Sequence, residues 1–159
     1  MSREISVDDL ELLDHRFGRV NRRMPIGPVR WPHHDLFWIH EGRARLHLPE
    51  QDATLDLSAP GGVLLLPGTM FEGTTVGAYA TATICHFTIR GYGDGPGYLL
   101  PHPGEALHLQ NMLRLAMHLA HRDHAEDLAR RKRLLLTLLD GFAERPAPAE
   151  DGDEDRMAL

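Results

Sequence analysis

Only one cysteine, Cys85, occurs in the 159-residue chain. An internal disulfide is therefore excluded, and the composition suits a reducing compartment such as the cytoplasm. Because Cys85 stands in the β-favouring run AYATATICHFTI, we expect a small core residue rather than a nucleophile. The chain also lacks a run of about eighteen apolar residues, and its polar amino terminus has no signal-peptide core. These absences predict a soluble cytoplasmic protein with no membrane partner.

An excess of positive charge is missing as well. The 23 acidic residues outnumber the 17 basic ones and give a formal charge of −6. The chain therefore has no general electrostatic footprint for a nucleic-acid backbone, and we do not expect it to hold DNA by itself. A length of 159 residues with 42% hydrophobic content allows one domain with a sizeable core, and a tail.

Strand patterns dominate residues 33–71. Charge and apolarity alternate between residues 43 and 48, so that Ala44, Leu46 and Leu48 share one face of a half-buried strand. Consecutive hairpins of this kind must close or pack to hide their edges, which predicts an antiparallel barrel or sandwich. Four short strands separated by turn residues are expected, at 35–40, 43–48, 54–57 and 63–66.

The segments around this block are predicted from composition. Residues 6–13 begin with an N-cap serine and predict a short helix or an arm laid across the barrel. Residues 17–29, with two prolines and two glycines, predict an edge strand or a loop. We expect a loop at 72–78 and a long strand at 79–89. The glycine-rich loop 91–97 marks the end of the barrel.

Two helices are predicted after the barrel. Asp123 and Glu126 have the form of a capping box that opens the second one, residues 124–144. Leu134 and Leu138 lie outside its core stripe, so we expect them at a homodimer interface. The two core stripes are Leu109, Met112, Leu113, Ala116 and Ala120 in the first helix, and Leu128, Leu135, Leu139 and Phe142 in the second.

Short motifs in the barrel resemble a known family. Gly42, the Pro60-Gly61 pair and Pro67 are spaced as in the cupin barrel. The segments DLFWIHEGRARL, PGGVLLLPG and CHF resemble more narrowly the ligand-sensing amino-terminal domain of AraC-type transcription regulators. The resemblance covers residues 20–144. It implies a mainly β fold with α, namely a cupin-like antiparallel β-barrel (a double-stranded β-helix or jelly roll) followed by two C-terminal helices.

The resemblance also implies a domain organisation. Residues 1–100 would form the ligand-binding barrel with an N-terminal arm, which closes the pocket in sensors of this type. Residues 104–144 would form the helical pair that dimerises. Residues 145–159 hold five acidic residues and two prolines, the composition of a linker. The family reads DNA with a pair of helix-turn-helix units, which nothing after residue 144 could supply. The chain is then either part of a longer regulator or a stand-alone sensor acting through a partner.

The metal-binding pattern of the cupins is not retained. Alignment on Gly42, Gly61 and Pro67 places the three histidine positions on Pro28, Arg30 and Glu72, and the glutamate position on Asp35. The resemblance therefore predicts neither a tightly held metal nor another cofactor. A site built from His33, Asp35, Glu72 and His86 remains an alternative.

Without a metal the barrel is expected to hold a small polar ligand. In the family, residues three and one before the strand-ending Phe contribute to the pocket, and here these are Ile84 and His86. Two carboxylates against one arginine and two histidines favour a ligand rich in hydroxyls, such as a sugar, or one carrying an amine. The predicted ligand-binding residues are Arg30, His33, Asp35, Phe37, Met70, Glu72, Ile84 and His86.

The sequence thus predicts a non-enzymatic effector-binding and dimerisation domain of an AraC-type regulator. It would reach DNA only through a domain outside this chain, and no catalytic residue is assigned. Two alternatives stay open. One is a small metal-dependent cupin enzyme, such as an isomerase or a dioxygenase, and the other is a stand-alone sugar-binding cupin.

Overall fold

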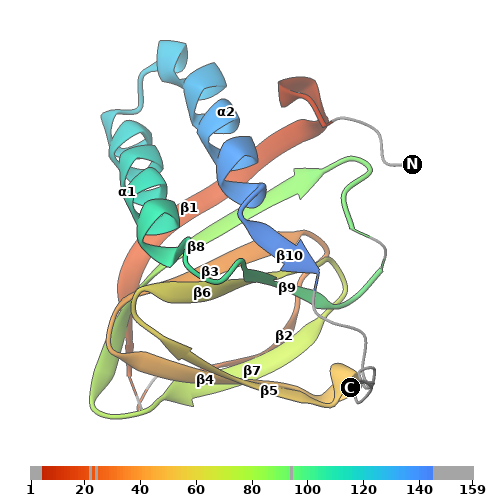
Figure 1. Ribbon diagram of the computed structural model, residues 1–159, viewed down its shortest axis with the longest axis vertical. Coiled ribbons are helices and arrows are strands. Elements are labelled where there is room, and N and C mark those ends of the chain that lie inside the picture. Colours follow the sequence, from red (N-terminus) through yellow and green to blue (C-terminus); the bar gives the residue numbers. More distant parts are fainter. Residues whose placement is uncertain (1–4, 22, 24, 94, 145–159) are drawn as a thin grey trace, which may run out of the picture.

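The computed structural model describes residues 5–21, 23, 25–93 and 95–144 of the chain (Figure 1). The predicted linker at 145–159 lies outside the described residues. The helices and strands are, in chain order, β1 (Leu10–Asn21), β2 (Ile26–Arg30), β3 (His34–Glu41), β4 (Arg43–Leu48), β5 (Ala53–Ser58), β6 (Gly61–Leu65), β7 (Met70–Thr75), β8 (Tyr79–Ile89), β9 (Tyr98–Pro101), α1 (Ala106–Arg122), α2 (Leu128–Leu139) and β10 (Phe142–Glu144).

The strands form two antiparallel sheets that face each other (Figure 1). The larger sheet has six strands in the order β1-β8-β3-β6-β9-β10, and the smaller has four in the order β2-β7-β4-β5. The mainly antiparallel β fold with two helices is thereby confirmed. The described strands make two separate sheets rather than a closed barrel, and the jelly-roll connectivity stays a prediction.

Strand β3 is apolar along most of its length because it is buried on both faces. Phe37 and Ile39 point between the sheets, where they pack with Leu46 of β4 in an inner core. Leu36 and Trp38 point to the other face of the six-stranded sheet and join an outer core with the helices. A strand covered on both sides reads as a continuous apolar run instead of an alternating one.

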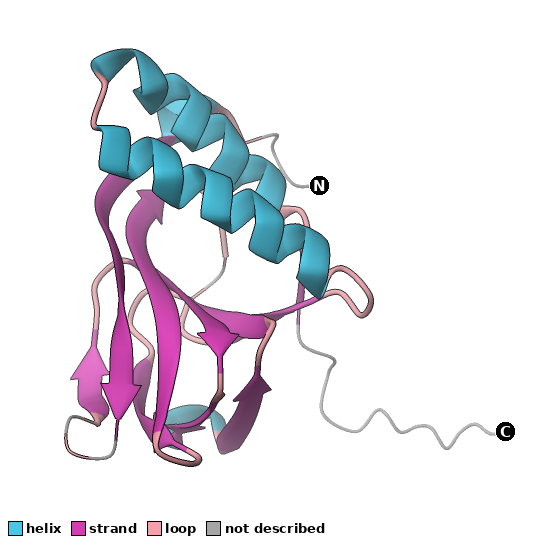
Figure 2. Ribbon diagram, turned by 90° about the vertical axis from the view of Figure 1, so that its left-hand side faces the viewer, coloured by secondary structure: helices cyan, strands magenta, loops and turns pink. Residues whose placement is uncertain are grey.

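Helices α1 and α2 cover the outer face of the six-stranded sheet (Figure 2). Leu109 and Leu113 of α1 and Leu135 of α2 are at most 3% exposed in the outer core. Burial of a leucine side chain contributes about 1.5–3 kcal/mol. A buried hydrogen bond of 3.2 Å from Trp38 Nε1 to Gln110 Oε1 fixes α1 on the sheet. The prediction of two helices packed outside the β domain is confirmed.

The second helix is shorter than the sequence suggests. Asp123 ends α1 in the left-handed conformation (φ 54°) rather than capping the next helix. A 3-10 turn at Ala125–Asp127 precedes α2, and α2 ends at Leu139. Residues 142–144 then pair with β9 as strand β10. The predicted capping box and the predicted helix over 140–144 are therefore wrong.

Two other segments differ in part from the prediction. Residues 10–21 run along β8 as the edge strand β1, after a single 3-10 turn at Val7–Asp9, so the edge strand expected within 17–29 is present at 17–21 but begins earlier than predicted. The expected loop at 72–78 is instead largely strand β7, which pairs with both β2 and β4. Gly73 made this stretch resemble a loop, but a Cβ at Gly73 would stand 2.4 Å from Leu46 Cδ2. Glycine is needed there for close packing within the sheet.

Cys85 is a core residue, as expected. It is 2% exposed in the outer core, and burial raises the pKa of its thiol to about 12. Within the described residues, no helix combines the length and the apolar character needed to cross a bilayer.

Candidate functional site

Asp35 and His86 lie directly opposite each other on neighbouring strands. The antiparallel register pairs Asp35 of β3 with His86 of β8, and Leu65 of β6 lies on the other side of Asp35. Strand alternation turns both side chains toward the inner core, to which Phe37 and Ile84 belong two residues away. Only 4% of Asp35 and 6% of His86 is exposed. A carboxyl group and an imidazole thus stand side by side in an apolar interior.

The polar atoms of this pair lack the hydrogen bonds that burial normally requires. His86 Nε2 and Asp35 Oδ2 are 3.5 Å apart, which is an ion-pair distance. Neither His86 Nε2 nor Asp35 Oδ1 has a hydrogen-bond partner in the described structure. Leaving a buried polar atom unpaired costs about 1–3 kcal/mol. Other buried atoms without a partner occur elsewhere in the described structure, for example His34 Nδ1, but Asp35 and His86 place two of them on opposed side chains that face the inner core, so this pair is the candidate site.

Two further rings lie against His86. The His33 ring centroid is 4.4 Å from that of His86, and the Trp31 centroid is 5.2 Å from it. Trp31 also stacks on His33, with 5.3 Å between centroids and 15° between ring planes. Trp31 and His33 are partly exposed, whereas Asp35 and His86 are buried. The two outer rings therefore separate the buried pair from solvent.

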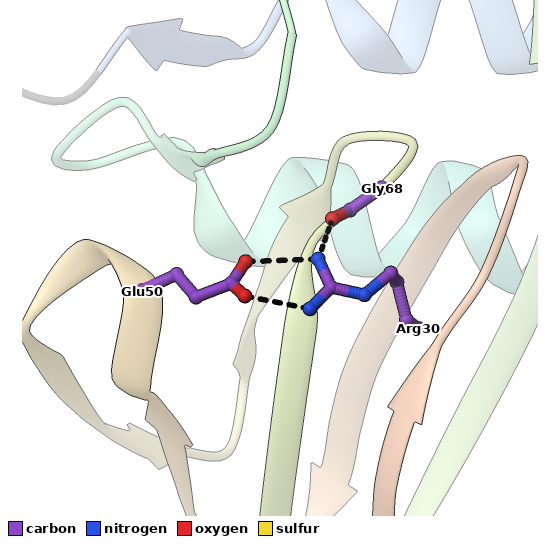
Figure 3. A network of polar contacts seen from close by, with 3 residues as sticks. All are labelled: Arg30, Glu50 and Gly68. Carbon is purple, nitrogen blue, oxygen red and sulfur yellow. Dashed lines mark hydrogen bonds and ion pairs between the residues drawn. The ribbon is translucent and has the colours of Figure 1, made fainter.

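Arg30 ties together the loops next to these rings (Figure 3). Its guanidinium donates to both carboxylate oxygens of Glu50, at 2.8 and 2.6 Å, and to the carbonyl oxygen of Gly68 at 2.8 Å. The Gly68 N–H in turn donates to the carbonyl oxygen of Trp31 at 2.8 Å. Hydrogen bonding raises the pKa of Arg30 and lowers the pKa of Glu50. Both groups are exposed, so this bidentate pair sets geometry more than it adds stability.

Three of the eight predicted ligand residues lie away from the interior. Phe71 of β7 is 3% exposed and points inward, so Met70 and Glu72 on either side of it point outward. The Glu72 side chain is 51% exposed, 3.5 Å from His47. Arg30 lies opposite Met70 in the β2–β7 register and is paired with Glu50. This placement corrects the expectation that Arg30, Met70 and Glu72 line the interior. Glu72 lies in the segment 72–78 that was expected to be a loop, to which strand alternation was not applied.

The other five predicted residues are brought together, namely His33, Asp35, Phe37, Ile84 and His86. Of the two adjacent histidines, His33 contacts His86 on the Asp35 side, and His34 does not. His34 points to the outer core, where its ring stacks on Phe87 and its Nε2 lies 3.2 Å from the Tyr92 carbonyl oxygen. Burial lowers the pKa of His34. Trp31 was not among the predicted residues, although its place two residues before His33 puts it on the same side of an extended chain.

No group of three or more His, Cys, Asp or Glu side chains within the described residues is arranged to hold a metal ion. The alternative that combined His33, Asp35, Glu72 and His86 in one metal site fails at Glu72, which points away from the other three.

The two leucines predicted at a dimer interface have different surroundings. Leu138 is 1% exposed and packs in the outer core with Leu135 and Leu139. It lies three residues after Leu135 and so falls on the same helix face, which removes it from any partner's reach. Leu134 is partly exposed.

The observed arrangement defines a class of fold, a two-sheet antiparallel β domain whose larger sheet carries two helices on its outer face. Structures of ToxT from Vibrio cholerae have a similar fold. ToxT from strain O395 is 13% identical and matches 86% of this chain and 56% of its own, with a TM-score of 0.51. Unsaturated-fatty-acid-bound ToxT from strain SCE256 is 15% identical and matches 90% of this chain and 58% of its own, with the same TM-score of 0.51.

At these identities the likeness establishes the fold alone, and this chain spans under three fifths of the ToxT chains. A cupin protein from Bacteroides fragilis, 10% identical, matches 51% of this chain and 69% of its own with a TM-score of 0.40, too low to add to the argument. No protein-family model matches the sequence, and no curated protein matches it either.

Proposed function

We propose that the domain is the effector-binding and dimerisation domain of an AraC-type transcription regulator, and that it binds a small polar ligand beside Asp35 and His86. One observation carries the proposal: two buried, adjacent polar groups have unpaired atoms beneath the partly exposed rings of Trp31 and His33. Support comes from the AraC-like segments of the sequence and from the fold shared with ToxT, an AraC-family regulator of which one structure is bound to an unsaturated fatty acid.

A ligand at this position offsets the cost of the unpaired atoms. A hydroxyl or amine hydrogen that reaches Asp35 Oδ1 replaces a missing hydrogen bond of about 1–3 kcal/mol. Phe37 and Ile84 supply an apolar wall, and Trp31 supplies a flat face. An apolar pocket with a few convergent polar groups is the usual form of a small-molecule site. A hydroxyl-rich ligand such as a sugar fits these donors and acceptors.

The same two strands connect the proposed site to the helices. Asp35 and His86 occupy the inner face of β3 and β8, and Trp38 and Thr83 the outer face of these strands. Trp38 bonds to Gln110 of α1, and the Thr83 hydroxyl lies 3.6 Å from Met117 Sδ of α1. A ligand that moves β3 against β8 therefore changes the surface on which α1 rests. We propose that contact with DNA is made by a domain outside this chain, because a formal charge of −6 gives this chain no general attraction for a nucleic-acid backbone.

Dimerisation is proposed through the exposed stripe of α2, which contains Leu134. Arg130, Arg133, Thr137 and Asp140 are exposed at helical spacing along it. If the two-fold axis of an antiparallel helix pair crosses α2 at the level of residue 135, each Arg130 lies opposite an Asp140 of the second copy. The helix surface is thus complementary to itself in charge.

Ligand-induced stabilisation tests the sensor proposal. The melting temperature of the purified chain is measured with a pentose, phenethyl alcohol, phenethylamine, phenylacetate and oleate. A ligand present at about 100 times its Kd adds about 2.7 kcal/mol, which raises the melting temperature by roughly 5–10 °C. The rise should disappear in Asp35→Asn/His86→Leu and persist in the exposed-site control Glu72→Gln. If no compound raises the melting temperature, or a rise survives in the double variant, the proposal fails.

We also propose that the domain is not an enzyme. Metal analysis of protein purified without added metal provides the check. Stoichiometric zinc, iron, nickel or manganese would favour the metal-dependent enzyme instead.

A further inference from the structure

We propose that the ligand class of the Asp35 site is an organic cation, a protonated amine attached to a flat ring. This inference rests on the proposed function, because it names what the same site binds. It differs from the sugar expected from hydroxyl-donor arguments and from the fatty acid named in the ToxT structure. Three features of the described residues support it, namely the unpaired carboxylate oxygen, the lack of a buried arginine or lysine, and the stacked rings.

The first feature is an acceptor of defined position. Asp35 Oδ1 is buried and unpaired, and the apolar side chain of Leu65 lies across the strand on the side away from His86. An ammonium group donates to a carboxylate through a charge-assisted hydrogen bond, which is roughly twice as strong as one between neutral groups. A neutral hydroxyl could occupy the same place but would leave the carboxylate charge uncompensated on that side.

The second feature is the composition of the interior. Among the described residues, the buried polar and charged side chains include two aspartates and two histidines but no arginine or lysine. Arg30, which lies five residues before Asp35 in the sequence, donates hydrogen bonds to Glu50 and to the Gly68 carbonyl oxygen outside the interior. A ligand carboxylate would therefore meet Asp35 without an arginine or lysine to bind it. The interior therefore disfavours an anionic ligand and favours a ligand whose positive charge neutralises the Asp35 carboxylate.

The third feature is the ring cluster. Trp31 and His33 are stacked at 5.3 Å, and both rings contact His86 next to Asp35. The face of a Trp ring attracts a cation within about 6 Å, with a contribution that grows when water is excluded. A flat ligand ring extends this stack while its ammonium group reaches Asp35 Oδ1. The carboxylate sets the charge of the ligand and the rings set its shape.

Three compounds that share one ring test the charge selectivity. Phenethylamine is cationic, phenethyl alcohol is neutral and phenylacetate is anionic, and each is titrated calorimetrically into the intact chain. Oleate and a pentose are titrated separately, to test a fatty acid and a sugar as ligands. Phenethylamine should bind at least about tenfold more tightly than the alcohol, and phenylacetate should not bind measurably. Titration in high salt should leave this order unchanged, because the site is buried.

Variants assign the selectivity to single residues. Asp35→Asn keeps the size of the side chain and should weaken phenethylamine at least about tenfold while leaving phenethyl alcohol within about twofold. Trp31→Leu should weaken both compounds. Glu72→Gln removes the same charge from the outer face and should change neither. Thermal denaturation confirms that each variant is folded, and the order of the three compounds on wild-type protein stands as a test that needs no variant.

The outcomes separate this inference from the proposed function. If oleate, the pentose or phenethyl alcohol binds at the Asp35 site and phenethylamine does not, the ligand class is refuted and the sensor proposal stands. If phenethylamine binds equally well to Asp35→Asn, the amine is not held by this carboxylate and the inference is overturned. If none of the five compounds binds, both proposals fall.

Discussion

Asp35 and His86 illustrate what a buried polar pair costs when nothing else bonds to it. Taking two such groups out of water requires compensation that a single 3.5 Å contact does not supply. Another pair in the same protein shows the contrast, because His47 and Glu72 are also opposed across two strands at 3.5 Å but are about half exposed. Water solvates this second pair, so its geometry has little energetic consequence. Burial, and not distance, distinguishes the two pairs.

Replacing the buried pair with apolar residues should stabilise the protein. The double variant Asp35→Val/His86→Leu removes the unpaired atoms and keeps the volume roughly constant, and we expect a gain of about 1–3 kcal/mol in the free energy of unfolding. Urea denaturation at neutral pH measures it. The matched control, His47→Leu/Glu72→Val on the exposed pair, should change stability by less than about 0.5 kcal/mol. A loss of stability in the buried double variant would show that the pair is already compensated.

Partly and fully buried histidines make the protein sensitive to acid. Burial, followed by the positive charges of Arg131 and His121, lowers the pKa of His15 from 6.5 to about 4. Burial also lowers the pKa values of His34 and His40. At a pH between 6.5 and about 4, His15 is protonated in the unfolded chain but not in the folded protein. The free energy of unfolding therefore falls as the pH drops through 6.5. For His15 the loss is complete near pH 4.

The variant His15→Leu should reduce this dependence. Its free energy of unfolding should fall less than that of wild type between about pH 7.5 and pH 4.5. Urea denaturation across this range gives both curves. Parallel curves for the variant and wild type would mean that His15 is protonated in the folded protein as readily as in the unfolded one.

At the scale of elements, hydrophobic periodicity predicted helices and strands correctly wherever tertiary contacts did not override the local pattern. The alternation of residues 43–48 is present as buried Ala44, Leu46 and Leu48 in β4. Of the predicted core stripes, Leu109, Leu113 and Ala116 are buried in α1, whereas Leu128 of the second stripe is 44% exposed. The predictions failed where a local signal had a tertiary cause. Gly73 resembled a loop residue because sequence alone does not show the neighbouring strand that excludes a side chain. Residues 142–144, which were predicted to be helical, instead form strand β10 and pair with β9.

The predictions for the candidate site also depended on whether strand alternation was recognised in the sequence. Asp35, Phe37, Ile84 and His86 were placed correctly because they lie on strands whose alternation was recognised. Met70 and Glu72 were misplaced together with the strand that carries them. The contact of Arg30 with Glu50 joins the end of strand β2 to the 3-10 turn Pro49–Gln51, and such a contact has no periodic signature in the sequence.

The close approach at Gly73 yields a prediction about β7. A Cβ added there would stand 2.4 Å from Leu46 Cδ2 and 2.7 Å from the Arg45 carbonyl oxygen. Because the second neighbour is backbone, the strands must separate, and Gly73→Ala should destabilise the protein by about 1–3 kcal/mol. A Cβ at Gly18, in the edge strand β1, would meet nothing within 4 Å, so Gly18→Ala is the control. Equal melting temperatures for the two variants would contradict a tight β4–β7 contact.

At the scale of the whole molecule, one sheet serves two cores. The six-stranded sheet carries the candidate site on its inner face and the helices on its outer face, so β3 and β8 contribute to both. The helices lie over the outer face of this sheet (Figure 2). Under the proposed function, a change in the interior would reach the helices through β3 and β8, without a hinge between domains.

The last prediction concerns that helix surface. If α2 pairs with its copy in antiparallel fashion, Arg130 of each chain faces Asp140 of the other, and the contact occurs twice. At about 0.5–1 kcal/mol for each exposed pair, Arg130→Asp should weaken the dimer by roughly 5–30-fold. The double variant Arg130→Asp/Asp140→Arg should restore it.

Leu134→Glu should give a folded monomer, whereas Leu138→Glu should unfold the chain, because Leu138 is 1% exposed. Sedimentation velocity at micromolar concentration separates these outcomes, and a monomeric wild type or a charge swap without rescue would rule out this pairing.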